Sequence, residues 1–139
     1  MNKALSLAVA ATLSCASLNS EAQTMIGKTT DVAAIANGDR MNAEALWAMG
    51  RIGGAAASPD GKTVVYQVGY YSVKQNKSHQ MLYTVSADGK KQHSLTTTAA
   101  SESDATWIDG GKRIAFLTGG QLWSMNADGT DRRQLTKSE

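Results

Sequence analysis

The amino-acid sequence predicts an all-β fold that contains about two blades of a β-propeller, preceded by a signal peptide and a short helix. The first observation is an internal repeat with a period of 40 to 50 residues. The second is that each repeat contains about four short runs suited to strands, separated by turn sequences. A period of this length with four strands per unit is the signature of propeller blades. The third is an apolar N-terminal stretch typical of an exported protein.

The repeat aligns in two blocks. Residues 57–66 align with residues 107–116 at an offset of 50, and residues 82–89 align with residues 122–129 at an offset of 40. The offset changes because the first unit carries ten extra residues within the segment 68–80. These extra residues are mostly polar, so we expect a lengthened surface loop there.

Turn and strand signals recur at the same places in both units. Pro and Gly favour a turn at residues 59–61, and two glycines do so at residues 109–111. The runs that follow, residues 64–68 and 114–117, are apolar on both faces, as expected of strands covered on both sides. Each unit then has an Asp-Gly hairpin and a short strand ending in Leu-Thr; these are Asp88-Gly89 with Leu95-Thr96 and Asp128-Gly129 with Leu135-Thr136.

The first 22 residues have the features of a signal peptide. Lys3 supplies a positive charge, residues 4–13 form an apolar run, and Ser20 and Ala22 are the small residues that signal peptidase requires. The apolar run is shorter than the roughly 20 residues that cross a bilayer. We therefore expect cleavage between Ala22 and Gln23 and a periplasmic or secreted mature protein.

Cys15 raises a second interpretation of the N-terminus, a lipid-anchored form. Bacterial lipoproteins usually carry Leu three residues before the modified cysteine, and this position is Thr12. Membrane attachment through Cys15 is therefore the minor interpretation. Since the sequence contains one cysteine, it excludes an internal disulfide and metal sites built from cysteine clusters.

The rest of the chain divides into a linker, a lead-in and a partial propeller. Residues 23–40 have weak order signals and are expected to form the linker. Residues 41–56 are expected to form a lead-in helix and a connection. The partial propeller covers residues 57–139, with units at about 57–104 and 105–139.

The lead-in helix is predicted from its capping residues and its apolar face. Asn42 can cap the N-terminus, and Gly50 is suited to the left-handed conformation that often follows a helix. Leu46 and Met49 lie three residues apart on one face, with Trp47 beside them. We expect this face to pack on the domain that follows.

Charged and titratable residues indicate neither a catalytic site nor a nucleic-acid-binding surface. The net charge is +2, and the basic residues are scattered. The basic pairs at residues 90–91 and 132–133 follow Gly-containing turns and are expected to be solvated hairpin ends. His79 and His93 are isolated from carboxylate clusters and are expected at the surface. We therefore assign no catalytic, cofactor-binding or metal-binding residue, and expect no cofactor and no nucleic-acid partner.

Two other patterns favour a structural role over binding. Residues 126–131 look faintly like a Ca²⁺ loop, but a calcium-binding loop needs Glu at its twelfth position, which here is Lys137. A hairpin turn is the better interpretation. Trp107, Phe116 and Trp123 occupy repeat positions, so we expect them in the blade core and not on a ligand-stacking surface.

These residues carry a resemblance to known propellers. Residues 58–62 (Ser-Pro-Asp-Gly-Lys) with the β run after them, and residues 122–130 with residues 133–136, resemble the blade motif shared by TolB and the prolyl oligopeptidase family. The second unit departs from the motif, since residues 108–110 are Ile-Asp-Gly where the motif has Ser-Pro-Asp. The lead-in sequence 42–52 is similar to the start of secreted bacterial dipeptidyl peptidases of the prolyl oligopeptidase family.

The resemblance implies the N-terminal propeller portion of a secreted serine peptidase that acts on short peptides. In that family a C-terminal α/β-hydrolase domain holds a Ser-Asp-His triad, with the serine in a G-x-S-x-G elbow. This sequence contains no G-x-S-x-G, so no triad residue is carried over. The propeller is then expected to gate access to a hydrolase domain outside this chain. The alternative is a non-catalytic TolB-like propeller that binds or scaffolds proteins.

Two further expectations concern the extent of the propeller. The chain ends at Glu139, just after the Leu-Thr that closes a unit, and propellers have about four to eight blades. We therefore expect the parent reading frame to continue. Two blades alone would leave strands uncovered, so residues 23–139 in isolation are expected to be marginally stable and prone to associate.

Overall fold

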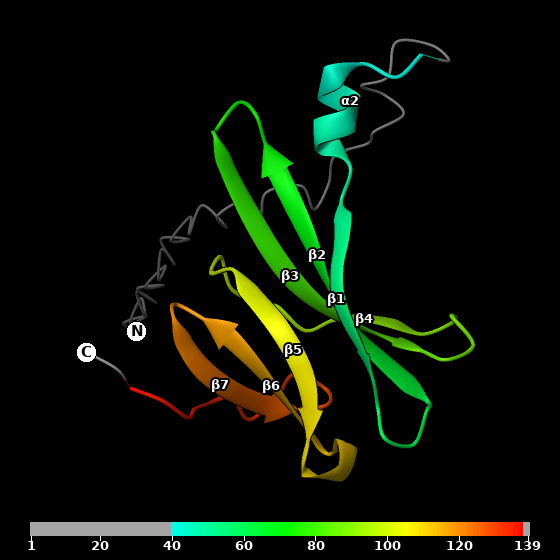
Figure 1. Cartoon of the computed structure of the whole chain (residues 1–139), viewed down its shortest axis with the longest axis vertical. Helices are drawn as coiled ribbons and strands as arrows, with labels where there is room; N and C mark the ends of the chain where they lie inside the picture. Colours follow the sequence, from blue (N-terminus) through cyan, green and yellow to red (C-terminus); the bar gives the residue numbers. More distant parts are fainter. Residues whose placement is uncertain (1–39, 138–139) are drawn as a thin grey trace, which may run out of the picture.

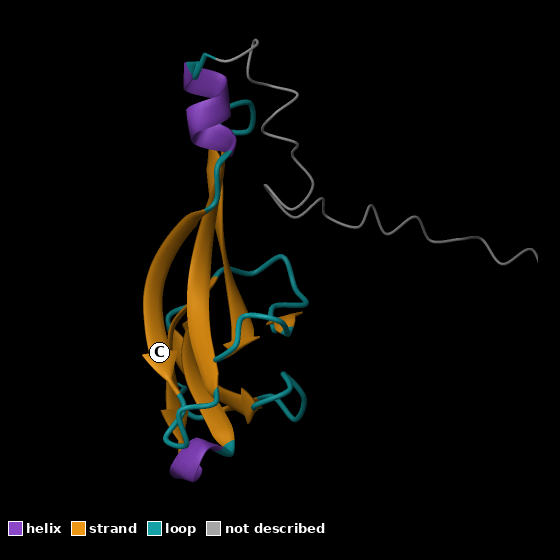
Figure 2. Cartoon of the chain, turned by 90° about the vertical axis from the view of Figure 1, so that its right-hand side faces the viewer, coloured by secondary structure: helices purple, strands orange, loops and turns teal. Residues whose placement is uncertain are grey.

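The computed structural model describes residues 40–137, which fold into two four-stranded antiparallel sheets (Figure 1). The strand orders are β1-β2-β3-β4 and β5-β6-β7-β8, so each sheet consists of strands that are consecutive in sequence. Helix α2 lies at one end of the molecule and the 3₁₀ turn η1 lies at the other (Figure 2). The elements are α2 (Ala43–Ala48), β1 (Arg51–Ala57), β2 (Thr63–Ser72), β3 (Lys77–Ser86), β4 (Gln92–Ser94), β5 (Glu102–Ile108), η1 (Asp109–Gly111), β6 (Arg113–Thr118), β7 (Gln121–Asn126) and β8 (Arg133–Gln134).

These two sheets confirm an all-β fold with about two propeller blades. The apolar runs predicted at residues 64–68 and 114–117 lie inside β2 and β6, the second strands of the two sheets. The Asp-Gly turns then lead into β4 and β8. A Leu-Thr pair follows each of these short strands, and both of its backbone N–H groups donate to a single carbonyl of the third strand. In the first sheet Leu95 and Thr96 donate to Leu82, and in the second Leu135 and Thr136 donate to Leu122.

The predictions for the N-terminus concern residues outside the described part of the chain. The signal peptide predicted at residues 1–22, the alternative lipid anchor at Cys15 and the linker as far as residue 39 all lie there, as do residues 138–139. Within residues 40–137, no helix is long and apolar enough to cross a bilayer.

The first strand of each sheet begins earlier than the repeat predicted. Almost all of β1 lies within the connection predicted at residues 41–56, and β5 begins at Glu102, inside the range predicted for the first unit. The β1 sequence is rich in Gly and Ala, which have low strand propensity, so it carried no strand signal. Backbone pairing with β2 defines the strand, interrupted by a bulge between Ile52 and Ala55.

The ten extra residues of the first unit lengthen a hairpin and do not form the predicted surface loop. β2 and β3 stay in register from the Thr63–Ser86 pair to the Ser72–Lys77 pair. The connecting loop is therefore confined to residues 73–76. Strand pairing satisfies the backbone N–H and C=O groups of a segment that a long irregular loop would leave to water.

Helix α2 is capped as predicted, but a different residue faces the sheet. The Asn42 side chain accepts a hydrogen bond from the Ala45 N–H at 2.7 Å. Ala45 is fully buried, whereas Leu46 and Trp47 are exposed. The predicted burial of Leu46 is therefore wrong, although the helix does lie against β2 and Trp47 contacts Tyr71 of that strand.

Gly50 does not adopt the left-handed conformation predicted for it. The helix ends at Met49 in an extended conformation, and the chain passes directly into β1. A Cβ atom at residue 50 would lie 2.9 Å from both Val68 Cγ1 and Tyr70 Cε1. Glycine is needed here for close approach to β2 and not for its backbone angles.

The main hydrophobic core lies between the two sheets. It combines three buried residues of each sheet, namely Val65, Leu82 and Leu95 with Ile114, Phe116 and Met125. Trp107 and Trp123 pack against this cluster, which confirms the prediction that the aromatic repeat positions belong to the blade core. A second cluster lies elsewhere on the first sheet and contains Val68, Met81 and Tyr83, with Tyr66 and Tyr70 against them.

Candidate functional site

A buried polar network links the two sheets, and its centre is an ion pair of the second sheet. Glu102 is the first residue of β5, and its side chain is 1% exposed; Arg132 precedes β8, and its side chain is 21% exposed. The guanidinium contacts the carboxylate through two bonds, Nη1 to Oε1 and Nη2 to Oε2, the second at 3.2 Å. A bidentate pair of this kind fixes both side chains in orientation.

Groups of the first sheet complete the network. Thr96 Oγ1 donates to Glu102 Oε2 at 2.7 Å and accepts from the Leu82 N–H at 2.8 Å. Arg132 Nη2 also donates to the Leu95 carbonyl at 2.8 Å. The ion pair is therefore bonded directly to the residues after β4, and through the Thr96 hydroxyl it is linked to β3.

The position of Arg132 overturns one prediction from the sequence. Residues 90–91 and 132–133 were expected to be solvated hairpin ends, and the side chains of Lys90 and Arg133 are indeed 81% and 66% exposed. Arg132 instead turns inward, with its guanidinium carbon 5.1 Å from the centre of the Phe116 ring. The buried carboxylate of Glu102 is the physical reason, because it requires a cation beside it.

Three further hydrogen bonds join the sheets along β5. Trp107 Nε1 donates to the Ala56 carbonyl at 2.9 Å, which connects the first strands of the two sheets. The Asp104 N–H donates to Gln67 Oε1 at 3.1 Å, and the Gln80 N–H donates to Ser101 Oγ at 3.2 Å. The contact between the sheets is therefore held by directional bonds along its length as well as by the apolar core.

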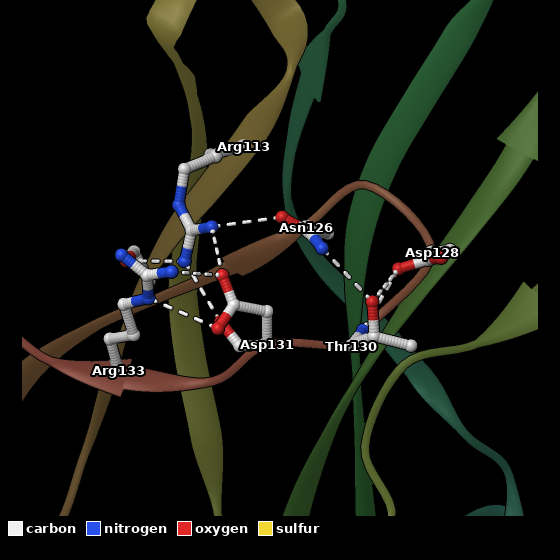
Figure 3. Close-up of polar contacts among 7 residues, drawn as sticks. Arg113, Asn126, Asp128, Thr130, Asp131 and Arg133 are labelled. Carbon is white, nitrogen blue, oxygen red and sulfur yellow. Dashed lines mark hydrogen bonds and ion pairs between the residues drawn. The ribbon is translucent and has the colours of Figure 1, made fainter.

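A second polar cluster lies at the outer turn of the second sheet (Figure 3). Arg113, at the start of β6, donates from Nη1 to Asn126 Oδ1 and to Asp131 Oδ2, both at 2.8 Å. Arg133 Nε donates to the other oxygen of Asp131 at 3.0 Å. Hydrogen bonds from Arg133 and Arg113 lower the pKa of the Asp131 carboxyl. Because both arginines are engaged with Asp131, this cluster stabilises the turn.

Besides the bonds from Arg113 and Arg133, the turn at residues 126–131 contains hydrogen bonds of its own. Gly129 N–H donates to the Asn126 carbonyl at 2.9 Å, and Thr130 Oγ1 donates to Asp128 Oδ1 at 2.6 Å. The hydrogen bond from Thr130 lowers the pKa of Asp128. This geometry confirms the hairpin turn that was preferred to a Ca²⁺ loop. Within the described ranges, no group of three or more His, Cys, Asp or Glu side chains is arranged to hold a metal ion.

A hollow of about 500 Å³ lies between α2 and the tip of the β2–β3 hairpin. Trp47 and Tyr71 meet edge to face with their ring centres 5.7 Å apart, and the Arg51 guanidinium lies over both rings. The hollow is lined by Trp47, Tyr71, Ser72, Val73, Asn76, Lys77 and Ser78. Its side chains can hold an apolar or aromatic group, but they contain no nucleophile paired with a base.

The two histidines differ in their surroundings. His93 is exposed, as expected, but His79 is 3% exposed and lies in the pairing of β3 with β2, so its predicted surface position is wrong. Neither ring nitrogen of His79 has a hydrogen-bond partner. His79 therefore orients no hydroxyl nucleophile, and the sheet contact remains the best-defined polar site of the described residues.

Removal of the cation from the buried pair should unfold the chain more easily. We expect Arg132→Met to lower the free energy of unfolding by about 3–5 kcal/mol, because it leaves the buried Glu102 carboxylate without its cation. Arg133→Met is the matched control, and it should change this free energy by about 1 kcal/mol or less because its ion pair is exposed. Urea unfolding followed by tryptophan fluorescence measures both. Equal losses in the two variants would contradict the assigned role of Arg132.

The sequence was also compared with known proteins. No family model matches it. Dipeptidyl-peptidase 5 of Porphyromonas endodontalis is 44% identical over 101 residues, which are 70% of this chain and 15% of the relative. Dipeptidyl-peptidase 5 of Porphyromonas gingivalis is 40% identical over 81 residues, which are 58% of this chain and 12% of the relative. The chain thus spans less than a sixth of the curated relatives that it matches.

Solved structures give the same fold. An acylaminoacyl peptidase from Pyrococcus horikoshii superposes with a TM-score of 0.57 at 13% identity, covering 69% of this chain and 15% of that protein. A protein described as TolB from Agrobacterium tumefaciens superposes with a TM-score of 0.51 at 19% identity, covering 63% of this chain and 34% of that protein. The solved structures thus show the propeller fold, and the 40–44% identity to the two dipeptidyl peptidases supports assigning the chain as a propeller portion of a prolyl oligopeptidase-family peptidase.

Proposed function

We propose that this chain forms the first blades of a secreted serine peptidase that acts on short peptides, and that these blades help to limit access to a catalytic site elsewhere in the protein. The observation that carries the proposal is the 44% identity to a dipeptidyl peptidase of which the chain covers only 15%. A catalytic hydrolase domain then belongs to the large remainder of the parent protein.

The contact between the sheets supports an access-limiting role. A propeller can exclude long peptides only if its blades do not separate easily. Here the Glu102–Arg132 pair is bonded to the Leu95 carbonyl and to Thr96, and Trp107 bonds across to Ala56. Directional bonds of this kind hold two blades at a fixed angle better than apolar packing alone, because they tolerate little displacement.

The proposal places the catalytic residues outside this chain. Nucleophilic catalysis by a hydroxyl requires a base within hydrogen-bond reach and a third group that orients the base. His79 has both ring nitrogens buried and unpaired, and the sequence contains no G-x-S-x-G elbow. The catalytic serine, aspartate and histidine are therefore proposed to lie in a C-terminal α/β-hydrolase domain outside this chain.

A second candidate function is a non-catalytic propeller that binds or scaffolds other proteins. The observation in its favour is the superposition on the TolB protein. This chain covers 34% of the TolB protein but 15% of the acylaminoacyl peptidase. The two candidates differ in one feature of the parent gene. A G-x-S-x-G segment several hundred residues downstream supports the peptidase, and a reading frame that ends without one supports the scaffold.

The peptidase proposal predicts where activity resides. We expect the product of the whole parent reading frame to release 4-nitroaniline from dipeptidyl-4-nitroanilides, and residues 23–139 alone to release none. Replacement of the elbow serine by alanine in the whole protein should abolish release, because the nucleophile is lost. A whole protein without an elbow and without hydrolysis would favour the scaffold. Turnover by purified residues 23–139 would show that catalysis was assigned to the wrong part.

The export proposal predicts a defined mature N-terminus. The positive charge at Lys3, the apolar run 4–13 and the small residues before Gln23 motivate it. N-terminal sequencing of protein from the periplasm or medium should begin at Gln23. A mature form that begins at a lipid-modified Cys15 would favour the anchored alternative, and full-length cytoplasmic protein would refute export.

A further inference from the structure

The β2–β3 hairpin extends beyond the sheet to which it belongs (Figure 1). On one side, β1 ends its pairing with β2 at the Arg51–Gly69 pair. On the other, β4 pairs only with residues 83–85 of β3. Residues 70–80, here called the outer hairpin, are therefore a ribbon of two strands. Such a ribbon is marginally stable on its own and depends on its side-chain contacts.

The outer hairpin contacts the rest of the chain at its base and near its tip. At its base, the Tyr70 and Tyr83 hydroxyls share a hydrogen bond at 3.2 Å, and the Gln80 N–H donates to Ser101 Oγ. Nearer its tip, Tyr71 packs against Trp47 of α2, and the Arg51 guanidinium lies over the Tyr71 ring. Each of these contacts is individually weak, so the packing at the base decides whether the outer hairpin stays in place.

His79 lies at this base and is enclosed there. It pairs directly with Tyr70 across the two strands, at the first position beyond the end of β1. Alternation along β3 puts His79 on the same face as Met81 and Tyr83, which are buried. Both ring nitrogens are buried and lack a hydrogen-bond partner. The site therefore accepts the neutral ring and offers no acceptor to a protonated one.

The groups around His79 do not compensate for a proton on its ring. Tyr70 pairs with His79, and Tyr66, Tyr70 and Tyr83 are the titratable side chains of the second hydrophobic cluster on the same sheet; burial raises the pKa of Tyr83 and keeps that phenol neutral. Glu102 on β5 is the charged group whose field reaches His79, but its oxygens are bonded to Arg132 and Thr96. Burial lowers the pKa of His79 from its ordinary value of 6.5, and Glu102 opposes this with a smaller effect.

We propose that His79 makes the outer hairpin acid-sensitive: its ring takes up a proton only by leaving its buried position, and this detaches residues 70–80 from the first sheet. The lowered pKa of His79 gives the direction of the pH dependence. The attached hairpin is most stable above pH 6.5, the ordinary pKa of histidine. This stability is lost as the pH falls below that value, because the detached state binds the proton more tightly. Detachment would also open the hollow beside Trp47, since Tyr71 and Lys77 of the hairpin line it. The inference is independent of the peptidase proposal.

Hydrogen exchange of the outer hairpin tests this inference. The protein is compared at about pH 7.5 and about pH 5, on either side of the ordinary histidine pKa, with rates corrected for intrinsic exchange. We expect protection of amides 70–80 to fall about tenfold or more in acid, while β5 to β8 keep theirs. His79→Leu should remove the acid response. His93→Gln is the matched control; it changes the other histidine, which is exposed, and should preserve the response.

Three outcomes would overturn the inference. They are an unchanged acid response in His79→Leu, no acid response in the unsubstituted protein, and a loss of protection that extends equally through β5 to β8. If His79→Leu does not fold, ¹⁵N-histidine NMR of the unsubstituted 139-residue chain decides, since this chain has two histidines. Protonation of His79 should then coincide with detachment of the outer hairpin, and separate midpoints would refute the coupling.

Discussion

A carboxylate and a guanidinium enclosed between two sheets impose the constraint on which the fold depends. Glu102 is almost fully buried, and an isolated charge in that position would be strongly destabilising. Arg132 neutralises this charge. From the first sheet, Thr96 donates a hydrogen bond to Glu102, and the Leu95 carbonyl accepts one from Arg132. Because these bonds cross between the sheets, the sheets cannot separate or slide without exposing the pair or leaving one of its bonds unmade.

This constraint divides the described chain into a fixed part and an extended part. The fixed part is the pair of sheets, in which the apolar core and the bond from Trp107 to Ala56 reinforce the ion pair. The extended part is the outer hairpin together with α2. Among the described residues, the second sheet has no corresponding hairpin extension or helix. In the proposed peptidase, the fixed part would serve as a wall of the propeller, whereas the extension could change its position without disturbing that wall.

Local sequence patterns predicted the second strand of each sheet, the turns and the Asn42 cap, because short-range propensity decides these features. β1 escaped prediction because its glycines and alanines form a strand only through pairing with β2. The inward positions of Arg132 and His79 depend on side chains distant in sequence, so neighbouring residues carried no signal for them. A polar composition at 72–78 likewise failed to distinguish a hairpin from a loop.

We infer that bonds across the sheet contact make the two blades one cooperative unit. A double-mutant cycle between Thr96→Val and Arg132→Met, measured by urea unfolding, tests it most directly. Both residues bond to Glu102, so we predict a coupling free energy of about 1 kcal/mol or more. The matched cycle uses Thr136→Val in place of Thr96→Val. The Thr136 hydroxyl accepts from the Leu122 N–H, as the Thr96 hydroxyl does from the Leu82 N–H, but it does not bond to the ion pair. In the matched cycle the two free-energy changes should be additive. Additivity within about 0.5 kcal/mol in both cycles would contradict a cooperative contact between the blades.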